Sequence, residues 1–390
     1  MIGSRDMRNA MPPTSEHFSV FGGPLHRAGR RLGLVRGETN TIMLGLALGW
    51  APWLLIVGVA LVEGVGDRML SMALVAGHAR LLVVIPLVFV AETWVAPRMA
   101  ASVDTIARNG VVPPGERPAL HAEVSRVRRW ANWWWPEVAC LVLAILLDVT
   151  GSRLQTYGES STFDPARNSL SFLVYAHVGM LAFRFLVFRT AWKLALWGWF
   201  LWRVSRLELD LIAGHPDRAG GLGSLEGAHE RFTPLVAALS VLECAALAES
   251  ISTGRLEVAA VYPTLALLIL LDGVLFLGPL LVFVDKLWAA RTRGVGRYNG
   301  LAARYVREFE TKWLDQAPRD EPLLGTADIQ SLADLANATS VVKGMRWITI
   351  GPRLLGMMAI ALVAPLTPLL LFRYPIADLA QKFFSKLVGF

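Results

Sequence analysis

Long apolar stretches and polar segments alternate along this chain, and seven of the apolar stretches are long enough to cross a bilayer. A membrane-spanning helix needs about 20 mostly apolar residues. The pattern therefore predicts an all-α, polytopic integral membrane protein with about seven transmembrane helices. The predicted spans are Ile42–Val62, Ala73–Ala96, Trp133–Val149, Leu170–Phe188, Phe232–Ser252, Val258–Val284 and Leu354–Phe372.

The composition agrees with a membrane protein. Hydrophobic residues make up 54% of the 390 residues and charged residues only 18%, with a mean hydropathy of +0.47. Soluble domains carry about 25% charged residues, so disordered chains and ordinary soluble enzymes are excluded. The two cysteines, Cys140 and Cys244, lie in apolar runs and predict neither a disulfide framework nor a zinc site. The polar start of the chain does not resemble a signal peptide.

Lysine and arginine alternate between the two sides of the predicted spans. From the first segment to the last, the counts are six, two, six, two, six, one, eleven and three. Cytoplasmic loops of membrane proteins carry an excess of these residues. The alternation predicts seven spans, with a cytoplasmic N-terminus and a periplasmic C-terminus. The alternative is a six-span chain with a re-entrant C-terminal segment.

Most of the polar sequence falls on the predicted cytoplasmic side, as helical extensions of the spans. Tyr298, Tyr305 and Phe309 repeat at helical spacing between arginines, which predicts an amphipathic helix beneath the membrane. The last 15 residues predict a second amphipathic helix, too short to span. The expected domains are a cytoplasmic segment 1–40, spans 1–6 within 41–284 with cytoplasmic loops 97–132 and 189–231, a cytoplasmic helical segment 285–353, and the seventh span with the C-terminal helix, 354–390.

Ionisable residues inside the spans are the first candidates for function. A charge at the bilayer centre costs about 2.5–3.5 kcal/mol on insertion scales, so such a residue faces protein or water. Glu243 and Asp272 are expected near the midplane, and Glu249 nearer the outside. They predict an ion path or proton site. The alternative is a pair of neutral acids hydrogen-bonded to neighbouring helices.

A second group of charges is expected in the cytoplasmic third of the membrane. Glu92 lies late in the second span, Glu137 early in the third, and Arg184 late in the fourth. They predict either a charged inner vestibule or an ion-pair cluster that fixes helix packing.

The most distinctive short motif is a turn between the fourth and fifth spans. Proline and glycine residues favour a tight turn here, and the alternatives are a metal site shared with His229, a phosphate cradle, or the motif of a J-domain. A structured turn is favoured. Its candidate residues are His215, Asp217, Arg218, Gly220 and Gly221.

Two strings carry a resemblance to a known group of proteins. His-Pro-Asp-Arg-Ala-Gly-Gly-Leu-Gly at 215–223 and Ala-Asp-Ile-Gln-Ser-Leu-Ala-Asp-Leu at 327–335 resemble an uncharacterised family of bacterial polytopic inner-membrane proteins. The resemblance covers roughly the C-terminal half and the end of the second span. It implies a location in the bacterial inner (plasma) membrane and carries no activity over to this chain.

Two function classes follow from these features. The first is an ion channel or an ion- or proton-conducting transport protein, active as a homo-oligomer in the lipid bilayer. The second is a non-conducting scaffold or sensor that binds a cytoplasmic protein through its basic helical layer. Metalloprotease, hydrolase and Walker A signatures are absent from the sequence, so no enzyme, catalytic residue, metal, cofactor or nucleic-acid partner is expected.

Overall fold

The computed structural model describes residues 18–37, 39–149, 169–256, 261–315 and 327–373, and this part of the chain is all-helical. The predicted fold class is confirmed at that level. The amphipathic helix expected near the C-terminus lies outside the described residues. The α-helices are α1 (Pro24–Arg31), α2 (Ile42–Val62), α3 (Val75–Ala79), α4 (Ile85–Arg108), α5 (Arg117–Asn132), α6 (Trp134–Val149), α7 (Leu170–Val174), α8 (Met180–Ser205), α9 (Gly223–His229), α10 (Thr233–Ser252), α11 (Val261–Asp272), α12 (Val284–Trp313), α13 (Ala327–Lys343), α14 (Pro352–Val363) and α15 (Leu370–Arg373).

Three pairs of these helices are joined into long rods by single π-helical turns. Arg80–Val84 joins α3 to α4, Tyr175–Gly179 joins α7 to α8, and Gly273–Leu277 follows α11. The last turn continues through a 3₁₀ turn, Gly278–Phe283, into α12. Such π turns are rare, and they occur often at functional sites.

Six helical rods are long and apolar enough to cross a membrane. The first coincides with the predicted span, because its apolar run is bounded by polar residues at both ends. Several of the others continue well beyond the apolar stretch that predicted them. The six are Ile42–Val62, Val75–Arg108, Leu170–Ser205, Gly223–Ser252, Val261–Trp313 and Pro352–Leu369.

A seventh span depends on α6. This helix has 16 residues, or about 24 Å at 1.5 Å per residue, against about 30 Å of hydrocarbon. It meets α5 at a bend of 45°, and the two helices together are long and apolar enough for one span. The C-terminal stretch Pro352–Leu369, which we expected to be the uncertain one, is among the six. The count of six or seven therefore turns on the α5–α6 pair.

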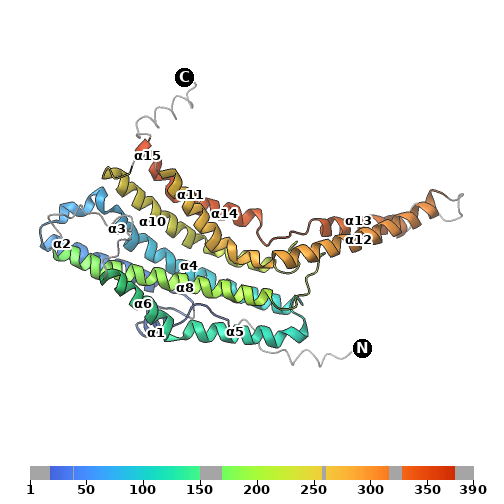
Figure 1. Cartoon of the computed structure of the whole chain (residues 1–390), viewed down its shortest axis with the longest axis horizontal. Coiled ribbons are helices and arrows are strands. Elements are labelled where there is room, and N and C mark those ends of the chain that lie inside the picture. The colour runs from blue at the N-terminus through green and yellow to red at the C-terminus, as the bar shows by residue number, and fades with distance from the viewer. Residues whose placement is uncertain (1–17, 38, 150–168, 257–260, 316–326, 374–390) are drawn as a thin grey trace, which may run out of the picture.

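Figure 1 shows a layered bundle with one long projection. Val75–Arg108 and Gly223–Ser252 form its centre, since 56% of the apolar window of each is buried. On one side of this centre α8 packs against α5 and α6, and on the other α11 and α14 pack against α10.

The projection is a hairpin of α12 and α13. The rod Val261–Trp313 has 53 residues, or about 80 Å, so most of it extends beyond a bilayer. Figure 1 shows α12 and α13 running together past the ends of α4 and α8. Near its tip the Tyr305 hydroxyl donates to the Asp328 carbonyl at 3.0 Å, and the Asp328 carboxylate accepts from Lys312 and Trp313 at 2.6 and 3.1 Å.

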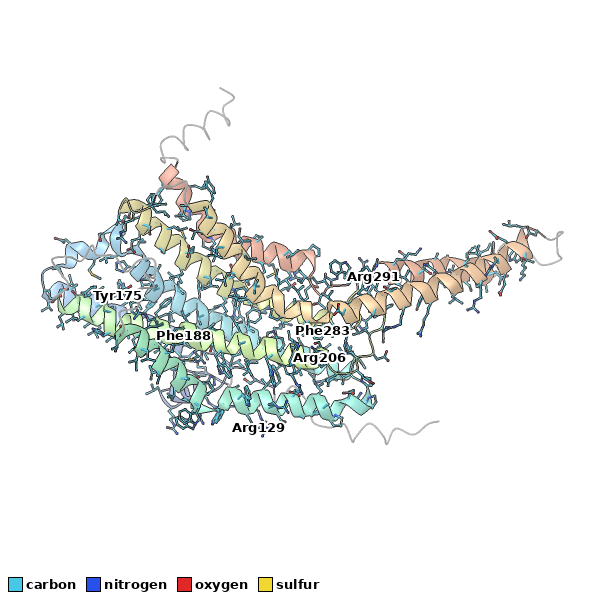
Figure 2. All side chains as sticks on the ribbon, in the orientation of Figure 1. Arg129, Tyr175, Phe188, Arg206, Phe283 and Arg291 are labelled. Atoms are coloured by element: carbon cyan, nitrogen blue, oxygen red, sulfur yellow. The ribbon has the colours of Figure 1, made fainter. Side chains whose placement is uncertain are left out.

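Tryptophans of α5 and α8 gather on one side of the bundle, and Trp130 and Trp202 are exposed there. Trp130 of α5 stacks on Trp192 and Trp199 of α8, with ring centroids 6.2 and 5.6 Å apart. The Arg206 guanidinium lies 5.1 Å from the centre of the Trp202 ring. Figure 2 shows Arg129 on α5 and Arg206 at the end of α8. Tryptophan gathers where membranes meet water, so this level is consistent with a membrane boundary.

Two glycines let α2 approach the central rod closely. Gly45 and Gly49 form a Gly-x-x-x-Gly motif, which is typical of closely packed membrane helices. A Cβ on Gly49 would lie 2.2 Å from the Leu81 carbonyl oxygen, and one on Gly45 would lie 2.6 Å from the Phe89 Cβ. The first of these obstacles is backbone, which cannot rotate away.

We therefore expect Gly49→Ala to lower stability by about 1–3 kcal/mol, the usual cost of overpacking. Gly58→Ala is the matched control in the same helix, because its Cβ would meet nothing within 4 Å. Thermal unfolding of both variants in detergent micelles tests this. Equal melting temperatures for the two variants would contradict the close approach.

Candidate functional site

A cluster of buried charges holds α4, α6 and α8 together. Arg189 is 1% exposed, and its guanidinium bridges Glu92 and Glu137, which are 4% and 5% exposed. Its Nε donates to Glu137 Oε1 at 3.1 Å, and its Nη1 and Nη2 donate to the two oxygens of Glu92. Each carboxylate thus meets an opposite charge, as buried charges require.

The same cluster anchors the N-terminal segment. Lys193, one turn after Arg189, donates to the Gly22 and Ala131 carbonyls at 3.1 and 3.2 Å. Glu137 Oε2 accepts from the Leu25 backbone N–H at 2.8 Å, in the first turn of α1. The cluster therefore ties four separate parts of the chain to one point, with two negative and two positive side chains in balance.

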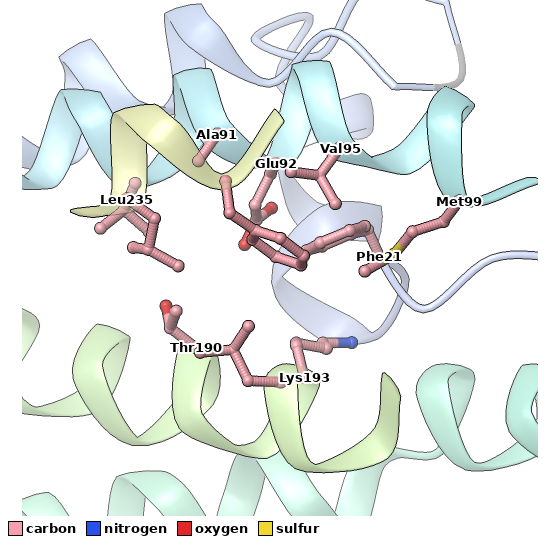
Figure 3. A pocket seen from close by; sticks show the side chains of 11 residues that line it. Phe21, Ala91, Glu92, Val95, Met99, Thr190, Lys193 and Leu235 are labelled. Atoms are coloured by element: carbon pink, nitrogen blue, oxygen red, sulfur yellow. The ribbon is translucent and has the colours of Figure 1, made fainter. Parts of the chain in front are cut away.

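A small cavity lies beside this cluster (Figure 3). It measures about 10 Å³, which is space for one water molecule. Glu92 and Thr190 border it from α4 and α8, and the buried Thr190 hydroxyl has no hydrogen-bond partner among the described residues. The cavity is too small for a charged vestibule. Of the two predicted roles, the geometry therefore favours an ion-pair cluster that fixes helix packing.

The prediction that Arg184 belongs to this cluster is wrong. Its Nη1 donates to Asp148 Oδ1 at 3.0 Å, and His177 Nδ1 contacts the other oxygen of Asp148 at 2.7 Å. Arg184 and Arg189 are five residues apart, which separates them by about 140° around α8. Asp148 lies eleven residues beyond Glu137 along α6, so Arg184 differs from the cluster in level as well as in helix face.

The π turns Arg80–Val84 and Tyr175–Gly179 contact each other through a buried arginine. Arg80, which is 2% exposed, starts the first turn and donates from Nη1 to the hydroxyl of Tyr175, which starts the second, at 2.7 Å. Arg80 lies in the second predicted span, Ala73–Ala96. Its pairing with a tyrosine of another span has no signature in the sequence.

His229 lies in the core and not at the predicted turn. It is fully buried, accepts from Trp197 Nε1 at 3.1 Å and contacts the Phe276 carbonyl through Nδ1 at 2.7 Å. This arrangement favours the tautomer with the proton on Nδ1. It joins α8 and α9 to the third π turn, and it excludes His229 from a metal site with His215 and Asp217. No group of three potential ligands of this kind occurs in the described ranges.

The three acids predicted for an ion path differ in their surroundings. Asp272 ends α11 on its inner side, in line with buried Leu268 and Phe276, and is 7% exposed. Neither of its carboxylate oxygens has a hydrogen-bond partner among the described residues. Glu243 of α10 is half-buried, and its Oε1 has no such partner either. Glu249 is 1% exposed, two turns further along α10.

The motif at 215–223 forms a tight turn, as predicted. The Asp217 carboxylate accepts backbone N–H bonds from Ala219, Gly221 and Gly223 at 2.8, 3.2 and 2.8 Å. Its Oδ1 also lies 2.8 Å from His215 Nδ1. Arg218, Gly220 and Gly221 all adopt positive φ, of 56°, 65° and 99°. One side chain therefore organises the whole turn.

This turn locks the base of the hairpin onto the bundle. Arg346, which follows α13, donates its backbone N–H to the Arg218 carbonyl at 2.7 Å and its guanidinium to Glu226 at 2.8 Å. Gly294 of α12 packs so closely on Ala213 that a Cβ would lie 2.2 Å away. The glycines and the aspartate thus have a structural use, as a joint between hairpin and bundle.

Comparison with protein-family models, with curated proteins and with solved structures finds no match to this chain. The function must therefore be argued from its own geometry.

Loss of Arg189 would leave two carboxylates facing each other in the core. We expect Arg189→Gln to cost about 3–5 kcal/mol, the usual effect of breaking a buried ion pair from one side. Adding Glu92→Gln and Glu137→Gln should recover much of this loss, because no uncompensated acid remains. The measurement is thermal unfolding with the yield of folded protein. Arg184→Gln is the control on the same helix, and an equal effect there would contradict a special role for Arg189.

Asp217 makes the stability of the turn dependent on pH. Burial acts to raise the pKa of Asp217, but the three backbone N–H donors and His215 outweigh it and hold the pKa below its usual value. Its stabilising effect is therefore complete above the unfolded pKa of about 3.9 and is lost as pH falls through the lower folded pKa.

Asp217→Asn should destabilise the protein by about 1–2 kcal/mol at pH 7, through weaker hydrogen bonds. The gap between wild type and variant should then close as pH falls below about 4. Thermal unfolding across pH 3–7 measures both effects, with the exposed Asp210→Asn as control. A gap that stays constant over this range would refute the assignment.

Proposed function

We propose that the protein conducts protons or small cations across a membrane, along a path that passes Asp272 and Glu243. The single observation behind this is the state of Asp272. It is buried at the inner side of α11, yet neither carboxylate oxygen has a hydrogen-bond partner among the described residues. An unpaired buried acid is costly, and ion and proton paths are where membrane proteins use such groups.

The contrast with the other buried acids supports this proposal. Glu92 and Glu137 share Arg189, and Glu123 accepts from Arg126 and Arg203. The chain thus places an arginine against the acids that hold its helices together. Within the described ranges Asp272 and Glu243 have no ion pair of this kind, which is the arrangement expected of acids that exchange a proton or a cation.

The surroundings of the two acids also suit a path. Asp272 directly precedes the π turn Gly273–Leu277, where the backbone hydrogen-bonding pattern changes. Glu243 lies one turn beyond Ser240, whose hydroxyl donates to the Leu362 carbonyl in the last turn of α14. Both α11 and α14 pack on α10, so the proposed path runs along the α10 face that these helices cover.

The charge distribution supports an orientation for this path. The hairpin helix α12 carries five arginines. By the positive-inside rule we expect the hairpin and the N-terminal segment in the cytoplasm of a bacterial cell, with the bundle in the inner membrane. A homo-oligomer, with α10 and α11 near its symmetry axis, completes the proposal.

The test is ion flux in liposomes that contain the purified protein. Wild type should dissipate an imposed proton or cation gradient, and Asp272→Asn combined with Glu243→Gln should reduce this flux at least tenfold. The matched control is Asp334→Asn with Glu310→Gln, which makes the same chemical changes on the exposed hairpin and should leave flux unchanged.

Two outcomes would overturn the proposal. Absence of flux for H⁺, Na⁺ and K⁺ over several voltages, with folded protein verified by its thermal transition, would exclude conduction. Flux that is equal in wild type and the acid variant would remove Asp272 and Glu243 from the path.

A further inference from the structure

A stripe of arginines follows the outer side of the α12 hairpin helix. Arg293, Arg297, Arg304 and Arg307 are all exposed. Their spacing places them within a sector of about 80° around the helix and along about 21 Å of its axis. None of the four has an ion pair or a side-chain hydrogen bond among the described residues. We call these four residues the arginine stripe.

The structure separates this stripe from arginines with structural roles. Arg291, which the sequence groups with the others, turns toward the hairpin base, where its Nε and Nη2 donate to the Met345 and Lys343 carbonyls at 2.8 and 3.2 Å. The side chains that face α13, such as Tyr305 and Phe309, lie on the opposite side of α12 from the stripe. The stripe is therefore not used for the fold of the hairpin.

Its position limits which anionic partner it can meet. The hairpin extends away from the bundle, past the ends of α4 and α8 (Figure 1), so the outer part of the stripe lies beyond the bundle and at a distance from the level that a bilayer would occupy. Single-stranded nucleic acid binds through exposed aromatic rings together with basic groups. The aromatic residues of this hairpin section, Tyr298, Tyr305 and Phe309, are only partly exposed; the Tyr305 hydroxyl donates to the Asp328 carbonyl of α13, and the Tyr298 hydroxyl lies beside Gly214.

The spacing of the stripe matches a helical partner. Arg293, Arg297 and Arg304 follow i, i+4 and i+11, a repeat that one face of a second helix can copy with acidic residues. Leu301, 45% exposed, lies beside the stripe and offers an apolar contact. Glu308 follows Arg304 by one turn and ends the positive run, which limits the surface to about four turns.

We propose that the arginine stripe is the docking surface for an acidic amphipathic helix of a soluble partner protein. This surface is independent of the conduction path, and it lies on the same continuous rod as Asp272. Charge pairing along the stripe would supply specificity and fast association, both of which weaken with salt.

The probe is a synthetic 21-residue helical peptide with glutamates at i, i+4, i+11 and i+14, the spacing of the stripe, added to the full-length protein in lipid nanodiscs. Fluorescence anisotropy should show binding at low ionic strength. A peptide with the same composition but glutamates spread around the helix should bind at least tenfold more weakly. Changing the four stripe arginines to glutamine should reduce binding of the first peptide at least tenfold.

The matched control carries four Arg→Gln changes outside the stripe, at Arg31, Arg36, Arg117 and Arg129, all exposed. It should bind as wild type does, which separates the stripe from net charge. Equal loss in this control, equal binding of both peptides, or no binding of either would overturn the proposal. Stripe-dependent binding of a single-stranded RNA or of phosphatidylglycerol vesicles, stronger than that of the peptide, would overturn the partner class.

Discussion

The ion pairs of Arg189 are the interaction on which the bundle most depends. In a low-dielectric core, one guanidinium between two carboxylates is stable only while all three are present, since each unpaired charge would be costly. Glu92, Glu137 and Arg189 lie on three different helices, and Lys193 and Glu137 extend the network to the N-terminal segment. Close packing of Gly49 on Leu81 and the His229 bridge then fix the remaining helices around this centre.

Because these structural charges are paired, the exceptions gain meaning. Asp272 and Glu243 in the bundle, and the arginine stripe on the hairpin, are among the groups that have no ion pair within the described residues. Asp272 and the stripe lie at two levels of one rod, Val261–Trp313, and the turn organised by Asp217 holds that rod between them. The bundle core thus pairs its own charges, whereas the proposed partners, a cation at Asp272 and Glu243 and an acidic helix at the arginine stripe, would supply the opposite charge at the other two places.

The sequence predicted the helices better than their contacts. Ile42–Val62 agrees at both ends, because apolar length and flanking polarity decide where a membrane helix lies. Arg189 was counted as a loop residue because the predicted span ended at Phe188, whereas α8 continues to Ser205. Arg184, chosen in its place, pairs with Asp148 at the other end of α6. The bend between α5 and α6 depends on packing against α8, and the partner of Arg80 on tertiary contact, so neither could be found from local pattern.

The continuous rod from α11 to α12 has a mechanical consequence. The rod is held to the bundle near Arg291, which donates to the Met345 and Lys343 carbonyls. This attachment lies about 28 Å from Asp272 and about 33 Å from Trp313 along the helix axis. A stiff helix held between its ends rotates about the point of attachment. A sideways displacement of the hairpin tip would therefore move the Asp272 end in the opposite direction by a nearly equal distance. The π and 3₁₀ turns at Gly273–Phe283 lie between this attachment point and Asp272. Their flexibility would set how much of the displacement is transmitted to Asp272.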